Sequence, residues 1–348
     1  MKPMISGAMK AAWLMLAFLT CITNAIADDH QDAEPLANRI NELIKHEAIS
    51  LDLLLQTGLA YSLNDDDFFG GRGFEAANAR IGLHGSIDGG FFYKVQFNLV
   101  NEPNLLDAFI GYYFHEGIRV SLGAMKPRQT QDYIPHPGAT DFITRANITG
   151  LLVQSREVGV AAEGDIGGFY YYAGLFNGTR LANNNDNNKF YGIGRLQYTF
   201  PVLDDGMFRL GVNASHGESP GVTSGSFGPV LRGKRSIYGG DARLEARGFM
   251  LAAEYLAGQL ELMELPNETE LISGYYLSSG YWFSNNFMAL ARWQSWGYDV
   301  KDFRDHQFTI GTTHLLTSLK SLLINFDAYF PENGDAQYGF LLGLQVLL

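Results

Sequence analysis

Apolar residues alternate with polar or small residues along most of the chain from Ile49 onward. Leu51, Leu53, Leu55 and Tyr61, for example, put apolar side chains on one face of an extended segment. A period of two predicts β-strands with one apolar face. Sixteen such runs occur, and most end at Gly, Asn, Asp or Pro. They lie within residues 51–61, 77–83, 91–99, 108–114, 118–124, 158–162, 169–175, 190–200, 208–214, 238–246, 251–257, around 276, 287–293, 308–312, 322–330 and 338–348.

This number of alternating strands favours a transmembrane β-barrel over a soluble sandwich. Lipid offers no hydrogen-bond partner to the backbone, so a sheet in a bilayer must close on itself. Aromatic residues at the ends of the runs are typical of interfacial girdles. They are Tyr61, Phe91, Phe200, Tyr255 and Phe330. We therefore predict an all-β fold, a sixteen-stranded antiparallel barrel over residues 49–348, preceded by a short N-terminal helix.

Residues 1–27 have the pattern of a secretory signal peptide. Lys2 and Lys10 precede and flank an apolar stretch over 11–23, and Ala25-Ile26-Ala27 matches a cleavage site. The only cysteine, Cys21, lies inside this segment, so the exported chain would contain no disulfide. This pattern predicts export to the outer membrane of a Gram-negative bacterium.

Residues 28–48 are predicted to form a periplasmic linker. Apolar residues follow helical spacing between Asp32 and Glu47, and Pro35 suits a first helical turn. The helix is either a cap or linker beneath the barrel, or a short coiled-coil segment that helps to assemble an oligomer. Its length does not decide between them.

Composition excludes several classes of protein. Beyond residue 27, no apolar stretch is long enough to cross a membrane as a helix. The net charge is −12, and removal of Lys2 and Lys10 with the signal would lower it to −14. An acidic exported chain of this kind is not expected to bind nucleic acid.

Strand parity assigns many charged residues to the barrel interior. The predicted inward acids are Asp107, Glu157, Asp241, Glu245, Glu254 and Asp327. The interior would be mildly basic inside an acidic protein, which favours anions. The alternative is that arginines and glutamates pair across strands as scaffolding, and Asp241 to Arg247 has the spacing of such a ladder. The predicted inward bases are Arg80, Lys94, Arg119, Arg195, Arg209, Arg243, Arg247 and Arg292.

The segment 126–155 interrupts the alternation between the fifth and sixth runs. Loops of this length usually carry a function. Its bases are Lys126, Arg128 and Arg145, with Arg156 following at its exit. We predict that it folds into the barrel and narrows the pore; the alternative is an extracellular lid or a subunit latch.

Several stretches resemble the phosphate-selective porin O and P family. They occur in the family's order from Ala79 to the C-terminus. They are ARIGLHG (79–85), LDAFIGY (106–112), the strand that ends at Lys126-Pro127, FITR (142–145), REVGV (156–160), AGLFNG (173–178) with the Asn-rich 183–188, and LQV (344–346).

The resemblance implies a homotrimer of sixteen-stranded barrels in outer-membrane lipid, with passive diffusion of anions past the third loop. Arg80, Lys126 and Arg145 occupy the positions that best match the family's basic ligand contacts. The constriction segment has a single lysine, so phosphate selectivity is less well supported than the fold. The alternative functions are a general or dicarboxylate-type diffusion porin, and a structural barrel with a plugged lumen.

An outer-membrane enzyme is the remaining alternative. Catalysis would need Ser and His, or paired carboxylates, gathered at one site. His84, His115, His216 and His314 fall on different runs, and no G-x-S-x-G motif occurs. We therefore predict a channel without catalytic residues, metal or cofactor, whose partners are small anionic or polar solutes.

Overall fold

The computed structural model describes residues 48–64, 71–87, 89–100, 104–115, 117–181, 185 and 187–348. The predicted signal peptide and the helix predicted between Asp32 and Glu47 lie outside these residues. The described residues contain one short α-helix and one 3₁₀ turn, and both lie in the 126–156 segment. The short N-terminal helix is therefore not supported.

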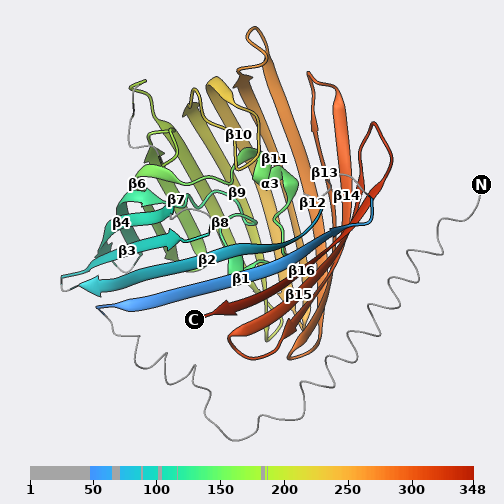
Figure 1. The fold of residues 1–348 in the computed structure, drawn as a ribbon. Helices are drawn as coiled ribbons and strands as arrows, with labels where there is room; N and C mark the ends of the chain where they lie inside the picture. Colours follow the sequence, from blue (N-terminus) through green and yellow to red (C-terminus); the bar gives the residue numbers. More distant parts are fainter. Residues whose placement is uncertain are drawn as a thin grey trace, which may run out of the picture. The chain divides into compact units, whose positions relative to one another are not determined.

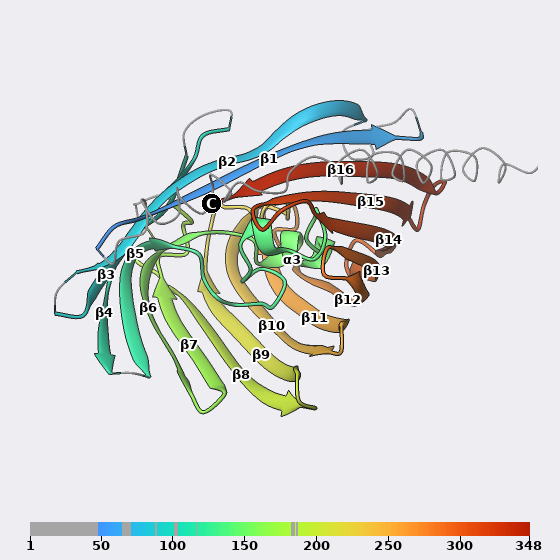
Figure 2. The same ribbon diagram turned by 90° about the horizontal axis from the view of Figure 1, so that it is seen from below.

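Sixteen antiparallel strands of the described chain form one closed barrel (Figures 1 and 2). Each strand pairs with its neighbours in the sequence, and β1 pairs with β16. The strands are β1 (Ser50–Ser62), β2 (Arg72–Ile87), β3 (Phe91–Asn98), β4 (Asn104–His115), β5 (Ile118–Met125), β6 (Glu157–Ile166), β7 (Phe169–Phe176), β8 (Tyr191–Val202), β9 (Gly206–Glu218), β10 (Leu231–Ala246), β11 (Phe249–Leu262), β12 (Thr269–Ser284), β13 (Phe287–Tyr298), β14 (Phe303–Leu315), β15 (Lys320–Phe330) and β16 (Gln337–Leu347).

The alternation along the strands separates an apolar outer face from a polar inner face. Outward Leu122 is 66% exposed, whereas inward Arg195 is only 2% exposed. A bilayer solvates the first kind of side chain, and water or a polar partner must satisfy the second. The predicted girdle residues Tyr61, Phe91, Phe200, Tyr255 and Phe330 are all exposed.

The barrel closes where the two ends of the strand sequence meet. β1 and β16 pair from Leu54↔Leu347 to Ser62↔Gly339. Beyond this register, Leu53 and Leu348 exchange two backbone hydrogen bonds of 3.2 and 2.9 Å. Leu348 is therefore part of the seam, and the strand predicted within residues 338–348 is confirmed.

The segment between β5 and β6 lies inside the barrel and contains η2 (Pro137–Ala139) and α3 (Asn147–Leu152). Figure 2 shows α3 within the ring of strands. Ile148, Leu151 and Leu152 pack against the inner side of β11 and β12, where Leu256 and Ile272 belong to the same buried cluster. No described helix is long and apolar enough to cross a membrane.

The connection between β9 and β10 packs against α3. Ser226 N–H donates to the carbonyl of Gly150 over 2.7 Å. A Cβ atom at Gly150 would lie 2.0 Å from the ring of Phe227, so glycine permits this close approach. Two inward loops therefore share one apolar core inside the barrel.

This core can be tested through Leu152, which is fully buried. Leu152→Ala should lower the free energy of unfolding by about 2–5 kcal/mol, because it leaves a cavity beneath α3. Leu196→Ala on the exposed outer face of β8 serves as the control and should lower the free energy of unfolding by less. The measurement is thermal unfolding of the purified protein in detergent, and equal midpoints for the two variants would contradict this packing.

Candidate functional site

Three cavities lie between the barrel wall and the β5–β6 segment. The seam cavity, of about 500 Å³, is lined by β1, β2, β15, β16 and residues 137–147 of the segment. The basic cavity, of about 300 Å³, is lined by β2–β7 and the start of the segment. The far cavity, of about 220 Å³, lies between residues 131–144 and β8–β13. Arg80 and Pro137 line both the seam and the basic cavity, so these two adjoin.

The basic cavity contains more cations than its carboxylates can pair with. Asp107 receives both Arg156, at 3.0 Å, and Lys94, at 3.8 Å. Among the described residues, the Arg80 guanidinium has one hydrogen bond, from Nε to Asn78 Oδ1 at 2.8 Å. Arg80 therefore keeps its terminal nitrogens available for a solute.

Lys126 Nζ and the Arg145 guanidinium both lie against the Tyr133 ring, 4.4 and 5.5 Å from its centre. Lys126 Nζ donates to the carbonyls of Ile134, at 3.2 Å, and Pro135, at 2.8 Å. Arg145 donates to the carbonyls of Asp132 and Pro135. Burial, and then Arg145 and other guanidinium groups, lowers the pKa of Lys126 to about 5. Burial also lowers the pKa of Arg145.

These lowered pKa values have one physical meaning. Several like charges share a partly desolvated space, so each charged form is destabilised by burial and by its neighbours. An anion in the cavity would relieve this repulsion. The arrangement is therefore suited to attract anions.

The far cavity holds cations that are more fully paired. Arg243 binds both oxygens of Asp141, at 2.7 and 3.0 Å, and also Glu245 at 2.5 Å. Arg292 donates to the Thr144 carbonyl over 3.0 Å. Arg209 is the exception in this cavity, since its one ion pair among the described residues is the distant contact with Glu245 at 4.0 Å. Arg243 and Arg292 therefore anchor the segment to β10 and β13.

Other predicted inward bases form closed ion pairs. Arg119 and Arg128 both bind Glu163, each at 2.9 Å. Arg195 and Asp241 form a buried bidentate pair across β9, with contacts of 2.5 and 2.8 Å. A Cβ atom at the intervening Gly211 would lie 2.4 Å from Arg195, so the glycine lets the pair meet. These groups brace the wall, as the scaffolding alternative expected.

Arg247 does not lie on the inward face, and the parity prediction for it is wrong. β10 ends at Ala246, and Arg247 and Gly248 form an exposed two-residue turn to β11. Their φ angles are 51° and 79°, as a tight hairpin turn requires. The alternation of polar and apolar residues continues to Arg247 in the sequence, but the strand itself ends at Ala246.

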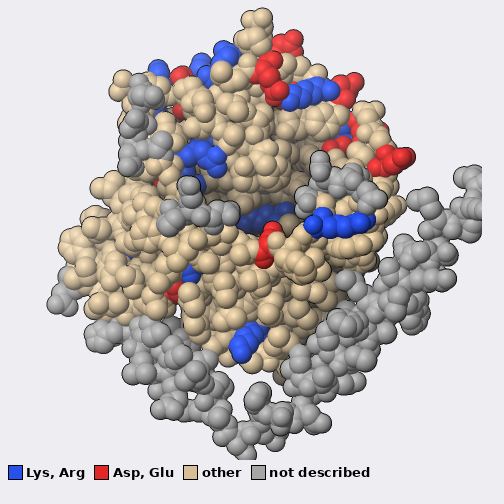
Figure 3. Space-filling view, in the orientation of Figure 1, with Lys and Arg blue, Asp and Glu red and all other residues tan. Residues whose placement is uncertain are grey.

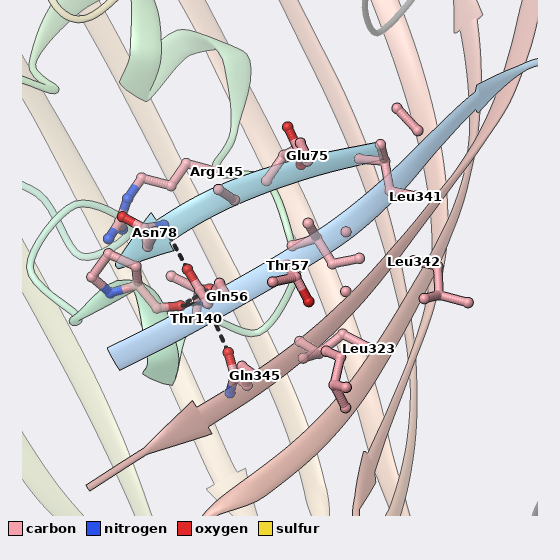
Figure 4. A pocket seen from close by; sticks show the side chains of 18 of the residues that line it. Gln56, Thr57, Glu75, Asn78, Thr140, Arg145, Leu323, Leu341, Leu342 and Gln345 are labelled. Carbon is pink, nitrogen blue, oxygen red and sulfur yellow. Dashed lines mark hydrogen bonds between the residues drawn. The ribbon is translucent and has the colours of Figure 1, made fainter. Parts of the chain in front are cut away.

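Three amides that sequence reasoning missed fix the tip of the segment to the seam. Asn78 donates to Gln56 over 2.6 Å, and Gln56 donates to Gln345 over 2.8 Å (Figure 4). Gln56 and Gln345 also donate to the carbonyls of Pro137 and Gly138. Their inward parity was the only signal in the sequence that could have indicated them.

A second buried anchor also escaped the sequence analysis. Arg235 on β10 pairs with Glu157 over 3.1 Å, and its guanidinium stacks on Tyr191 at 3.5 Å. Glu157 follows the segment directly, so this pair fixes its exit. In Figure 3, basic side chains lie within a hollow of the face that is shown.

Comparison with known proteins agrees with this architecture. The family model for phosphate-selective porin O and P matches residues 58–290, more than half of the chain. A relative from Caulobacter vibrioides, named only as an uncharacterized protein, is 29% identical over 154 residues. That match covers 41% of this chain and 31% of the relative.

Three solved structures illustrate the likeness of fold. The anion-selective porin from Comamonas acidovorans has a TM-score of 0.67 at 15% identity, covering 86% of this chain and 99% of its own. OmpT of Vibrio cholerae in its trimer form has a TM-score of 0.65 at 12% identity, with coverages of 86% and 99%. OprB of Pseudomonas putida has a TM-score of 0.64 at 11% identity, with coverages of 90% and 97%.

Family and fold together point to a channel rather than an enzyme, and to the bacterial outer membrane. The sixteen-stranded barrel, the inward segment and the family match agree with one another. The chain therefore belongs to the phosphate-selective porin O and P family and is an outer-membrane porin.

Proposed function

We propose that this porin passes small anions by passive diffusion. The observation that carries the proposal is the basic cavity, where Arg80, Lys94 and Arg156 share Asp107 and Asn78 as their polar side-chain partners within the described part of the chain. A passage lined by one sign of charge raises the local concentration of the opposite ion. Arg145 adds its charge to this field, and Lys126 does so in its protonated form, which the lowered pKa restricts to acidic pH.

We propose further that residues 126–155 are the constricting element. The segment is held at several points of the inner wall. Glu254 on β11 accepts the backbone N–H groups of Gln131 and Asp132, at 3.1 and 3.2 Å. Asn147 binds Gln294 and Gln307 near its other end. A segment that is fixed on opposite walls leaves solutes only the space around it.

The solute range and the assembly belong to the same proposal. Phosphate is one candidate among small anions, since guanidinium groups bind phosphate and carboxylate alike. A homotrimer is proposed because the structures that resemble this chain include OmpT in a trimer form. Export through a signal peptide over 1–27 is proposed from its cleavage pattern.

Removal of the Arg80 charge tests the proposal. Arg80→Gln should lower the chloride-to-potassium permeability ratio by about two- to fivefold, because one charge at ~4 Å in water is worth about 1 kcal/mol. Reversal potentials in planar bilayers under a KCl gradient measure this ratio. Arg247→Gln removes an equal charge from an exposed turn and should leave the ratio unchanged. A wild-type channel that prefers potassium would contradict the proposal.

Titration of Lys126 gives a second test. Its pKa is lowered to about 5, so the ammonium form is gained as the pH falls through that value. The difference in chloride preference between wild type and Lys126→Met should therefore be larger at pH 4 than at pH 7. Burial lowers the pKa of His136 to about 4, and Lys126 contributes to that lowering, so both proteins are compared in a His136→Gln background, which removes this second titration. An equal difference at both pH values would refute this role of Lys126.

A further inference from the structure

The seam cavity differs in chemistry from the basic cavity that it adjoins. Its volume of about 500 Å³ falls within the range of about 300–1,000 Å³ typical of small-molecule pockets. One part of its wall is polar and cationic, and another part is apolar. Figure 4 shows Arg145 and the labelled leucines on opposite sides of the cavity.

Small residues in the wall make room for this cavity. Gly58 on β1 pairs with Gly343 on β16, and Gly343 pairs with Leu323 on β15. Ala60 pairs with Leu341 one step further along the inward face. A patch of wall without large side chains therefore lies beside two inward leucines.

Apolar side chains line the cavity beside this recess. Leu323 and Leu341 point into the barrel and are each 6% exposed. Ile143 of the β5–β6 segment lies 3.6 Å from the place a Cβ would take on Gly343. Phe227 of the β9–β10 connection lines the same cavity and is 58% exposed. Inward positions of a water-filled porin are ordinarily polar, so this apolar surface is suited to contact an apolar group of a solute.

The polar part of the wall provides a partner for one negative charge. Gln56, Asn78 and Gln345 bind one another and the segment, so their amides are largely engaged. The guanidinium of Arg80 is left for a solute, and Arg145 lies beside it in the lining. Arg80 also lines the basic cavity, so an anion bound at Arg80 can move on to the cations of that cavity.

Glu75 limits the charge that the cavity tolerates. It lines the cavity, and its Oε1 lies 3.3 Å from where a Cβ on Gly58 would be. A second negative charge on the solute would be repelled at that side. The wall thus combines a cationic end, an apolar surface and one carboxylate.

We propose that the seam cavity binds monovalent organic anions with an apolar body, such as aromatic carboxylates, on their way through the pore. The inference rests on the proposed anion channel and adds the class of solute. The carboxylate pairs with Arg80, and the ring lies against Phe227, Ile143 and Leu341. Inorganic anions use the charged end alone and gain nothing from the apolar surface.

Block of the chloride current by benzoate and by acetate tests this proposal. Both are monovalent carboxylates, so they differ only in the ring and methyl group. Burial of a phenyl ring should lower the half-blocking concentration of benzoate on the order of tenfold below that of acetate. Single-channel recording at fixed KCl in planar bilayers measures both.

Variants separate the apolar surface from the charge. Phe227→Ser and Leu341→Thr should each raise the half-blocking concentration of benzoate about threefold or more, because each removes apolar contact. Acetate block and the chloride reversal potential should not change. Leu210→Thr on the exposed outer face of β9 is the matched control and should behave as wild type. Phe227 lies in a loop, so its variant tests the proposal even if Leu341→Thr fails to fold.

Four results would decide against the proposal or its premise. Equal block by benzoate and acetate would overturn the organic-anion site, and so would benzoate block that neither variant changes. In both cases a chloride-selective reversal potential would leave the proposed function standing. Tighter block by phenylalanine than by benzoate would reassign the cavity to zwitterions, with Glu75 as the partner of the ammonium group. A potassium-selective channel would instead overturn the proposed function itself.

Discussion

The closure of β1 on β16 is the constraint on which the rest of the molecule depends. A bilayer cannot satisfy an open strand edge, so the first and last strands must pair whatever else the chain does. Leu53 and Leu348 complete this pairing at the chain end. The same seam holds the inward segment, because Gln56 and Gln345 bind its tip at Pro137 and Gly138. Barrel closure and pore geometry therefore rest on the same pair of strands.

The inward segment makes the lumen asymmetric. It needs its own apolar core, and Leu152 with its neighbours packs it onto β11–β13. Arginines on that side are used to anchor it, as Arg243 does with Asp141. On the opposite side, the inner wall at β2 and β3 faces the basic cavity and not the segment. The cations on that wall, Arg80 above all, have few protein partners for that reason, and their charge remains available to solutes.

The sequence predicted the architecture better than the site, for a physical reason. Alternation is a local property of a strand, so the sixteen strands could be predicted from it, and the family could be predicted from short stretches such as REVGV (156–160). Pairing between inward residues depends on register across strands, which parity does not contain. Arg80 and Arg195 look alike in the sequence. Among the described residues, however, Arg80 has a single side-chain hydrogen bond, whereas Arg195 binds both oxygens of Asp241. The seam amides are separated by as many as 289 positions, beyond the reach of any local pattern.

An acidic chain can nevertheless present a basic passage, and the structure explains how. The formal charge of −12 counts every residue equally, but a solute responds only to charges that are unpaired and near its path. Interior acids such as Glu163, paired with two guanidinium groups, and Asp241, paired with one, contribute little field. Asp107 serves two cations at once, which leaves positive charge in excess beside Arg80. Anion selectivity thus depends on which interior ion pairs can form. Small residues such as Gly211, which lets Arg195 reach Asp241, determine this as much as the charged residues do.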